Sequence, residues 1–227
     1  ILNGLIKKML IGDYIAVNFI DRVFGDPMRH TGFENIMALY GYSLQVYADF
    51  SGYTDIAIGV ALLMGFTLPM NFNSPYKARN VGEFWKRWHI SLSTWLRDYL
   101  YVPMGGNRSG SLFSWIMLGV IGAALVLLTG LLWLPVVFLS LFALSIVLVR
   151  ISPGAEKFIT TNLNLMITML IGGLWHGASW MFVIWGGLNG IGLLIYKGWA
   201  RISPWNRSTH WFARFQAIAI TFAFITF

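Results

Sequence analysis

Cysteine is absent from the 227 residues of this chain. Its absence excludes disulfide bonds, thiolate nucleophiles and metal sites with cysteine ligands, and it does not distinguish a reducing from an oxidising compartment. A catalytic group in this chain must therefore come from another residue type.

Charged residues are also scarce. They make up 11% of the chain, whereas 57% of the residues are hydrophobic; ordinary soluble domains are about 25% charged. Asp, Glu, Lys and Arg are all missing from four stretches, 56–76, 109–149, 158–196 and 215–227. A helix that crosses the hydrocarbon core needs about 20 apolar residues. The composition therefore argues against a soluble domain and predicts a polytopic membrane protein.

The pattern within these stretches indicates helices. Backbone groups in lipid must pair within their own segment or in a closed barrel, and a barrel strand alternates apolar and polar residues. The stretches are long and do not alternate, so we expect an all-α, polytopic integral-membrane helical bundle. Because the sequence has no initiator methionine and ends in an apolar run, we expect residues 1–227 to form a single membrane-embedded core, an internal part of a longer protein.

Positive charge gathers in one segment. The net charge of the chain is +7, and residues 73–110 hold six basic and two acidic residues. Basic loops of membrane proteins lie on the cytoplasmic side, so we expect this segment at the cytoplasmic face, with membrane lipids as partners. No nucleic-acid partner is expected, because this bias accounts for the basic charge.

The same segment predicts an unusual helix. Asn80 followed by Glu83 is typical of a capping box, and Pro103 predicts the end of a helix that begins near residue 81. At about 100° per residue, aromatic and charged side chains fall on opposite faces of 81–101. We therefore expect an amphipathic or re-entrant helix at the membrane interface, with His89 on the aromatic face.

The charge-free stretch 109–149 is too long for one crossing and fits two. Gly130 and Pro135 near its middle predict a turn. We expect an inserted helical hairpin over 111–158, with its two transmembrane helices near 111–150.

His176 lies near the middle of the charge-free stretch 158–196. Gly177 predicts a break there, between helices at about 159–175 and 179–198. An ionisable side chain at bilayer depth costs a few kcal/mol and is a functional-site hypothesis by default. The structural alternative is a hydrogen bond between helices that pack closely through glycines. A neutral imidazole in apolar surroundings can accept the proton of an attacking hydroxyl.

His89 is the second candidate among the four histidines. It would orient the donor or the acceptor, or stabilise a developing oxyanion; the alternative is a histidine packed among aromatic rings. A zinc site is not expected, because His89 and His176 are far apart in the sequence and no HExxH motif or cysteine ligand accompanies them.

Three strings occur in order: YADFSGYTDIAIG at 47–59, FNSPYKARNVGEFWKRWHISLSTWLRDYLYVPMGGNRSG at 72–110, and NLMITMLIGGLWHGASWMFVIWG at 164–186. Together they resemble the membrane-bound O-acyltransferase (MBOAT) family. The branch they resemble is that of bacterial alginate and peptidoglycan O-acetylation, which is related to the D-alanyl transfer protein of teichoic acids.

The resemblance implies a helical membrane fold with a tunnel that meets at an essential histidine, which matches His176; His89 matches the second polar position of the family. It implies an O-acyltransferase, in this branch an acetyltransferase, in the bacterial cytoplasmic (inner) membrane. The donor would be an acyl thioester, acetyl-CoA or an acyl carrier protein, and the acceptor a polysaccharide hydroxyl or an extracytoplasmic relay protein. No bound cofactor or metal is expected. Two departures from the family are the insertion at 111–158 and Asn189, which replaces a common histidine.

Six further residues are expected to bind donor or substrate: Trp175, Trp88, Lys86, Arg87, Asp49 and Asp55. The basic pair would bind the donor's phosphates or an acidic carrier protein, and anchoring to anionic lipid head groups is an equal alternative. The aspartates have a structural alternative as partners of buried cations. Two other function classes stay open: a transporter or channel with an intramembrane His/Asp relay, and a scaffold for polysaccharide export.

The expected hairpin predicts the membrane topology of its flanks. Reporter fusions after Arg108 and after Arg150 should lie on the same side of the membrane, because two crossings separate them. Paired alkaline phosphatase and green fluorescent protein fusions at each position would measure this. Fusions on opposite sides would mean one crossing or three.

Overall fold

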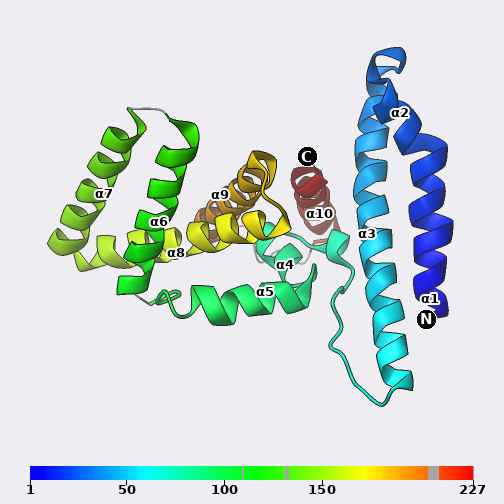
Figure 1. Ribbon diagram of the computed structural model, residues 1–227, viewed down its shortest axis with the longest axis horizontal. Coiled ribbons are helices and arrows are strands. Elements are labelled where there is room, and N and C mark those ends of the chain that lie inside the picture. Colours follow the sequence, from blue (N-terminus) through cyan, green and yellow to red (C-terminus); the bar gives the residue numbers. More distant parts are fainter. Residues whose placement is uncertain (109, 131–132, 204–209, 227) are drawn as a thin grey trace. The chain divides into compact units, whose positions relative to one another are not determined.

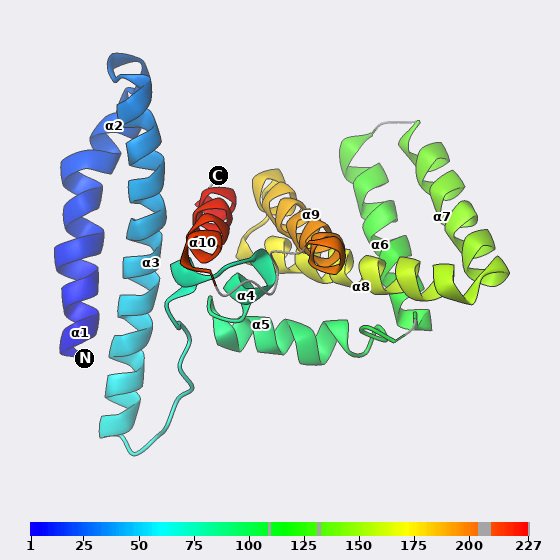
Figure 2. The same cartoon turned by 180° about the vertical axis from the view of Figure 1, so that it is seen from behind.

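The computed structural model describes residues 1–108, 110–130, 133–203 and 210–226 (Figure 1 and Figure 2). Every regular element within these residues is helical, which confirms the all-α class. They divide into two compact units. The first holds the chain up to Ser91 together with α10 (Trp211–Thr226), and the second runs Leu92–Ser203. Each unit is described separately.

A long antiparallel helix pair forms the base of the first unit (Figure 1). Its first arm joins α1 (Leu2–Leu5), the π-helical segments η1 (Ile6–Asp13) and η2 (Ala16–Ile20), and α2 (Asp21–Gly25). The 3-10 turn η3 (Pro27–Arg29) leads into the second arm, α3 (Gly32–Leu63). The arms touch at backbone level, because a Cβ added to Gly4 would lie 2.5 Å from the carbonyl oxygen of Gly52.

The capping of α3 explains where the second arm begins. The Thr31 hydroxyl accepts a hydrogen bond from the Glu34 N–H, and the Glu34 carboxylate accepts one from the Thr31 N–H at 2.7 Å. This reciprocal capping box satisfies two backbone donors that a helix start otherwise leaves without partners.

The expected helix over 81–101 is not continuous, which corrects the sequence-based prediction. Its residues form α4 (Val81–Trp85), α5 (Ile90–Leu96) and the π-helical η5 (Arg97–Tyr101). The predicted start is confirmed, since the Asn80 side chain accepts a hydrogen bond from the Glu83 N–H at 2.7 Å.

A neighbouring extended segment explains the break between α4 and α5. The Asn73 N–H donates to the Arg87 carbonyl at 2.9 Å, and the Ile90 N–H donates to the Asn71 carbonyl at 3.0 Å. These backbone groups bond to another part of the chain instead of continuing the helix. Between them His89 adopts a left-handed conformation with a φ of 43°.

An aromatic core fills the first unit. Its buried members are Phe72, Ala78, Phe84 and Trp88. The 3-10 turn η4 (Pro75–Lys77) and α10 close this core, because the Tyr76 and Phe222 rings meet edge to face at 5.0 Å between centroids.

The second unit begins within α5 and includes η5. Its long helices among the described residues are α6 (Leu112–Thr129), α7 (Leu134–Ile151), α8 (Pro153–His176) and α9 (Trp180–Ile202). The break predicted near Gly130 and Pro135 is confirmed by the end of α6 and the start of α7, and residues 131–132 between them lie outside the described residues. Gly130 ends α6 with a φ of 65°, a conformation that favours glycine, and Pro135 lies in the first turn of α7, where its missing N–H costs nothing.

Two helices of the described residues are long and apolar enough to cross a membrane, Gly154–His176 and Trp180–Ile202. The stretches Leu112–Ala124, Pro135–Ile151 and Trp211–Thr226 are apolar but shorter. These lengths agree with a membrane protein, and two crossings by the α6–α7 hairpin stay a prediction.

Helices α8 and α9 approach each other at backbone level. A Cβ added to Gly173 would overlap the carbonyl oxygen of Phe182, and one added to Gly186 would overlap that of Met169. Small residues bring helices together in lipid, where close van der Waals packing replaces the hydrophobic effect as a driving force. Glycine at both positions therefore sets the spacing of this pair.

Buried polar contacts tie α8 to the segment that follows η5. The Asn164 amide donates to the carbonyl oxygen of Met104 at 2.9 Å, and the Ser114 hydroxyl donates to the same oxygen at 2.7 Å. Around them pack Leu92, Leu96, Leu100, Met104 and Ile167. The α8 helix is thus fixed by both apolar packing and specific hydrogen bonds.

We predict that Gly186→Ala lowers the thermal stability of the protein, because the added methyl group meets backbone that has little freedom to move; overpacking of this kind costs about 1–3 kcal/mol. Gly198→Ala is the matched control on the same helix, since a Cβ there meets nothing within 4 Å. It should leave stability unchanged or raise it by up to about 1 kcal/mol, because alanine favours helix over glycine. Thermal aggregation in detergent would measure both, and equal stabilities would contradict the prediction.

Candidate functional site

His176 is the last residue of α8, and α9 begins at Trp180. The predicted break after His176 is therefore confirmed. The Ser179 side chain caps α9 by accepting a hydrogen bond from the Met181 N–H. A Cβ at Gly177 would lie 2.8 Å from the Phe182 ring, so a larger residue in this turn would displace that ring.

His176 lies where two apolar helices meet. The charge-free run 158–196 holds both helices, and its middle is the turn between them. Gly154–His176 and Trp180–Ile202 are candidate spans, and the depth of the imidazole in a membrane stays a prediction.

Aromatic rings surround the His176 imidazole. Trp175 and Trp185 meet it edge to face, with centroids 5.2 and 5.0 Å away, and Phe182 stacks on it at 6.0 Å. His176 is half-buried, whereas the Trp175 side chain is 57% exposed. The imidazole is thus neither sealed in packing nor fully in solvent, an arrangement that suits a group that must meet a substrate away from bulk water.

Asn189 lies one turn after Trp185 on α9 and is buried. Its amide donates to the Trp185 carbonyl at 2.9 Å, and its Oδ1 has no hydrogen-bond partner among the described residues. At this position the chain therefore places a buried amide on the helix that also carries the Trp185 ring.

His89 is held in the first unit by its backbone and by its ring. Left-handed backbone at a non-glycine residue costs about 1–3 kcal/mol and clusters at functional sites. The buried ring meets Phe50 edge to face at 4.7 Å, and its Nδ1 lies 3.4 Å from the Ser91 hydroxyl. His89 thus faces aromatic residues as predicted, although the helix that was to carry it is interrupted.

Trp88, the neighbour of His89, belongs to the aromatic core. It stacks on Phe84 at 5.5 Å and meets Phe72 edge to face at 5.0 Å. Its side chain is 9% exposed, so these contacts give it a role in packing, and its expected role in binding stays a prediction.

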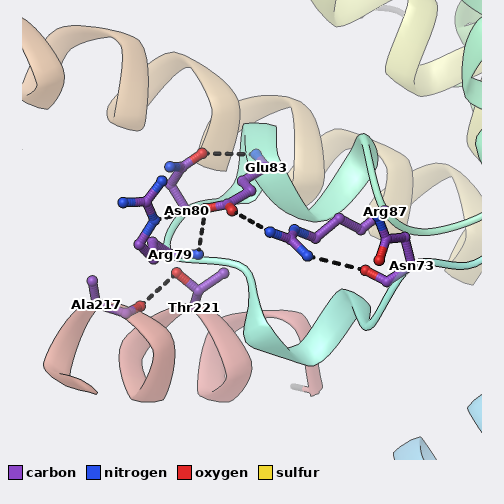
Figure 3. Close-up of polar contacts among 7 residues, drawn as sticks. All are labelled: Asn73, Arg79, Asn80, Glu83, Arg87, Ala217 and Thr221. Carbon is purple, nitrogen blue, oxygen red and sulfur yellow. Dashed lines mark hydrogen bonds and ion pairs between the residues drawn. The ribbon is translucent and has the colours of Figure 1, made fainter. Parts of the chain in front are cut away.

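Figure 3 shows how Glu83 lies between two arginines. Its carboxylate accepts hydrogen bonds from the Arg79 N–H at 2.9 Å and from the Arg87 guanidinium at 2.8 Å. Partial burial opposes ionisation of this carboxyl, but the backbone and side-chain hydrogen bonds from the two arginines outweigh it and lower the pKa of Glu83 to about 2. Glu83 is therefore ionised at physiological pH.

The two basic candidates differ in their surroundings. Arg87 donates to Glu83 and also to the Asn73 carbonyl at 3.1 Å (Figure 3), so its charge is balanced and it connects α4 to the extended segment. Lys86 is exposed. Of this pair, Lys86 is the side chain better placed to meet an anion from solution.

Both aspartate candidates pair with lysines of the first arm. Lys7 lies 2.7 Å from the Asp55 carboxylate, and Lys8 lies 2.7 Å from Asp49 and 2.8 Å from Asp13. These ion pairs join η1 to α3. They supply a structural reason for Asp49 and Asp55, and their expected roles in binding stay predictions.

The structure thus groups the sequence candidates by unit. Trp88 and His89 lie beside Lys86 and Arg87 in the first unit, and Trp175 and His176 lie together in the second. Among the described residues, no three histidine or carboxylate side chains come together as possible metal ligands.

Sequence reasoning missed three neighbours of the histidines, Phe182, Trp185 and Ser91, and it missed Asn71, which bonds to Ser91. The two aromatic residues follow the predicted break closely enough to fold back on His176, which was an available signal. Ser91 lies two residues after His89, within side-chain reach. Asn71 gave no signal, because its proximity depends on the extended segment that interrupts the helix.

Known proteins are similar in sequence to most of this chain. The profile of the family described as "MBOAT, membrane-bound O-acyltransferase family" matches residues 14–121. A Pseudomonas fluorescens protein named "Probable alginate O-acetylase AlgI" is 40% identical over 196 residues, which is 86% of this chain and 30% of that protein.

Two further relatives cover nearly the whole chain. The peptidoglycan O-acetyltransferase of Helicobacter pylori is 36% identical over 98% of this chain and 33% of its own length. The teichoic acid D-alanyltransferase of Bacillus subtilis is 28% identical over 99% of this chain and 47% of its own length. The chain spans about a third to a half of the length of these relatives. The family profile, the similarity along the chain and the predominantly apolar helices agree, and this chain belongs to the membrane-bound O-acyltransferase family.

Proposed function

We propose that this chain is part of a membrane O-acyltransferase. It would transfer an acetyl or similar acyl group from a thioester donor to a hydroxyl of a cell-surface polysaccharide or of an extracytoplasmic relay protein. Relatives named for alginate, peptidoglycan and teichoic acid support this class of acceptor. The structural observation that carries the proposal is the half-buried His176 among aromatic rings, at the turn between two apolar helices.

His176 acts as the general base in this proposal. A ring nitrogen of the neutral imidazole takes the proton of the acceptor hydroxyl, and the hydroxyl oxygen attacks the carbonyl carbon of the thioester. The new C–O bond forms, the C–S bond breaks, and the leaving thiolate takes the proton back from the imidazolium. The chain has no cysteine to form an acyl-enzyme, and direct transfer is the simplest route.

The surrounding rings support this chemistry in two ways. Trp185 and Phe182 cover part of the imidazole and would limit the access of water, which competes with the acceptor for the thioester. The exposed Trp175 ring, next to His176, supplies an apolar surface for an acyl chain and an indole N–H that can orient a carbonyl.

Basic residues of the first unit would bind the donor. A thioester donor such as acetyl-CoA or an acyl carrier protein carries phosphate, and lysine and arginine bind phosphate through charge-assisted hydrogen bonds. Lys86 is the proposed contact, because it is exposed, whereas Arg87 already engages Glu83. His89 is the proposed partner of His176 in the transfer.

The finer topology belongs to the same proposal. We place the protein in the bacterial inner membrane as a multi-pass protein, with α6 and α7 as an added pair of crossings. An even number of added crossings leaves the flanking topology intact, so the insertion is compatible with an active site formed by the rest of the chain.

The transporter alternative receives less support. A relay of intramembrane acids needs carboxylates that exchange protons, and Asp49 and Asp55 are instead held in ion pairs at 2.7 Å. Uptake into vesicles without any thioester donor would be the result that favours a transporter.

His176→Ala in the full-length protein should lower acyl transfer by at least about 100-fold, the scale expected for loss of a general base. Ester-bound acyl groups on the cell-surface polymer would be measured by their release in mild alkali, with the protein's abundance in the membrane checked by immunoblot. His30→Ala is the control, a second histidine that lies outside both candidate groups. An abundant His176→Ala protein with normal acylation would exclude the general-base role.

His89→Gly separates the side chain of His89 from its backbone conformation. Glycine adopts a φ of 43° without strain, so the variant should reach the membrane in normal amounts and still lose at least about tenfold of its transfer rate. His89→Asn, which tolerates the left-handed region and keeps a polar side chain, should retain more activity than His89→Gly. Full activity of His89→Gly would show that only the backbone shape matters.

A further inference from the structure

The Ser91 hydroxyl lies between an amide and an imidazole. Its Oγ is 3.0 Å from the Asn71 Oδ1 and 3.4 Å from the His89 Nδ1. The Ser91 backbone N–H also points to the Asn71 Oδ1, at 3.0 Å. Three polar groups from two segments of the chain thus form a short line that ends on the His89 ring.

The Asn71 amide fixes the direction of these hydrogen bonds. A backbone N–H only donates, so the Asn71 atom that faces Ser91 must be an acceptor, which identifies it as the carbonyl oxygen and not the NH₂ group. The Ser91 hydroxyl, at the same distance from that oxygen, therefore donates its hydrogen to it. A hydroxyl has one hydrogen, and Ser91 has then only lone pairs left for His89.

We propose that Asn71 and Ser91 are positioning residues that hold the neutral His89 ring in the tautomer with its hydrogen on Nδ1. The Nδ1–H donates to the Ser91 Oγ, and the lone pair of the ring lies on Nε2. In neutral imidazole one nitrogen is a donor and the other an acceptor, and the partner of one nitrogen sets the state of the other.

The surrounding backbone keeps this line in place. The Asn71 backbone carbonyl accepts a hydrogen bond from the Ile90 N–H at 3.0 Å. Ile90 lies between His89 and Ser91 in the sequence, so this backbone bond holds Asn71 beside both residues. Phe50 meets the His89 ring edge to face, with an angle of 84° between the ring planes. The plane of the imidazole is therefore set by packing and its tautomer by hydrogen bonding.

This tautomer decides between the two roles expected for His89. A neutral ring with its hydrogen on Nδ1 has no N–H at Nε2, so Nε2 does not donate to an oxyanion. It accepts a hydrogen bond instead and can orient a hydroxyl or amide N–H of the acceptor or donor. The role of His89 in acyl transfer rests on the proposed function. The tautomer is inferred from the hydrogen bonds alone and does not depend on that function.

The experiment is ¹⁵N NMR of the full-length protein labelled at histidine, in alkaline buffer where the rings are neutral. The His89 signals are identified by their loss in His89→Gly. We expect the ¹⁵N shift of a protonated nitrogen at Nδ1 and of an unprotonated nitrogen at Nε2. The opposite pattern in the unsubstituted protein would overturn the proposal without any need for a variant.

Variants at Ser91 test the cause. Ser91→Ala should convert His89 to a mixture of tautomers, and Ser91→Thr, which keeps the hydroxyl and the backbone N–H, should restore the single tautomer. Thr94→Ala on the same helix is the control and should leave the His89 signals unchanged. An unchanged His89 spectrum in Ser91→Ala would overturn the role of Ser91.

Acyl transfer by the same variants separates this inference from the proposed function. Ser91→Ala should reduce the transfer rate several-fold while Ser91→Thr stays near normal. If His89→Gly transfers normally, the proposed function of His89 fails, and the NMR result still decides the tautomer. If transfer depends on His89 but the ring carries its hydrogen on Nε2, the positioning proposal fails alone.

Discussion

The close contact between α8 and α9 is the constraint on which the His176 site depends. Gly173 and Gly186 let the two backbones touch, and only at this spacing do Phe182 and Trp185 of α9 reach the imidazole at the end of α8. Any side chain at the contact would separate the helices and remove the aromatic rings from the histidine. Gly173 and Gly186 thus set both the packing of α8 against α9 and the surroundings of His176.

A different device holds the second histidine. The extended residues around Asn71 and Asn73 take the hydrogen bonds that a continuous helix would have made within itself, and His89 is left in a left-handed conformation between α4 and α5. The strain is offset by the aromatic core beside it. The His89 ring is therefore held in a fixed orientation. A histidine in a regular helix would point its ring in a different direction.

Several charged side chains of this chain are held in ion pairs. Glu83 pairs with Arg79 and Arg87, and Lys7 of the first arm pairs with Asp55 of the second arm. Most of these charged side chains therefore have structural partners, and exposed Lys86 is the better candidate for binding an anion. The sequence shows that the segment 73–110 is basic. The ion-pair partners seen in the structure show which of its charged side chains remain available to a ligand.

Sequence reasoning was sufficient to predict the all-α class, the apolar helices, the Asn80 cap, the end of a helix at Gly130 and the break after His176. Each of these depends on local composition or on a residue with restricted backbone geometry. The strings of residues around both histidines also indicated the family. The folded arrangement was needed to show that residues 81–101 are interrupted, that Asp49 and Asp55 pair with lysines, and that Asn71 bonds to Ser91. These features depend on hydrogen bonds and ion pairs between segments distant in the sequence, and helical periodicity contains no information about such partners.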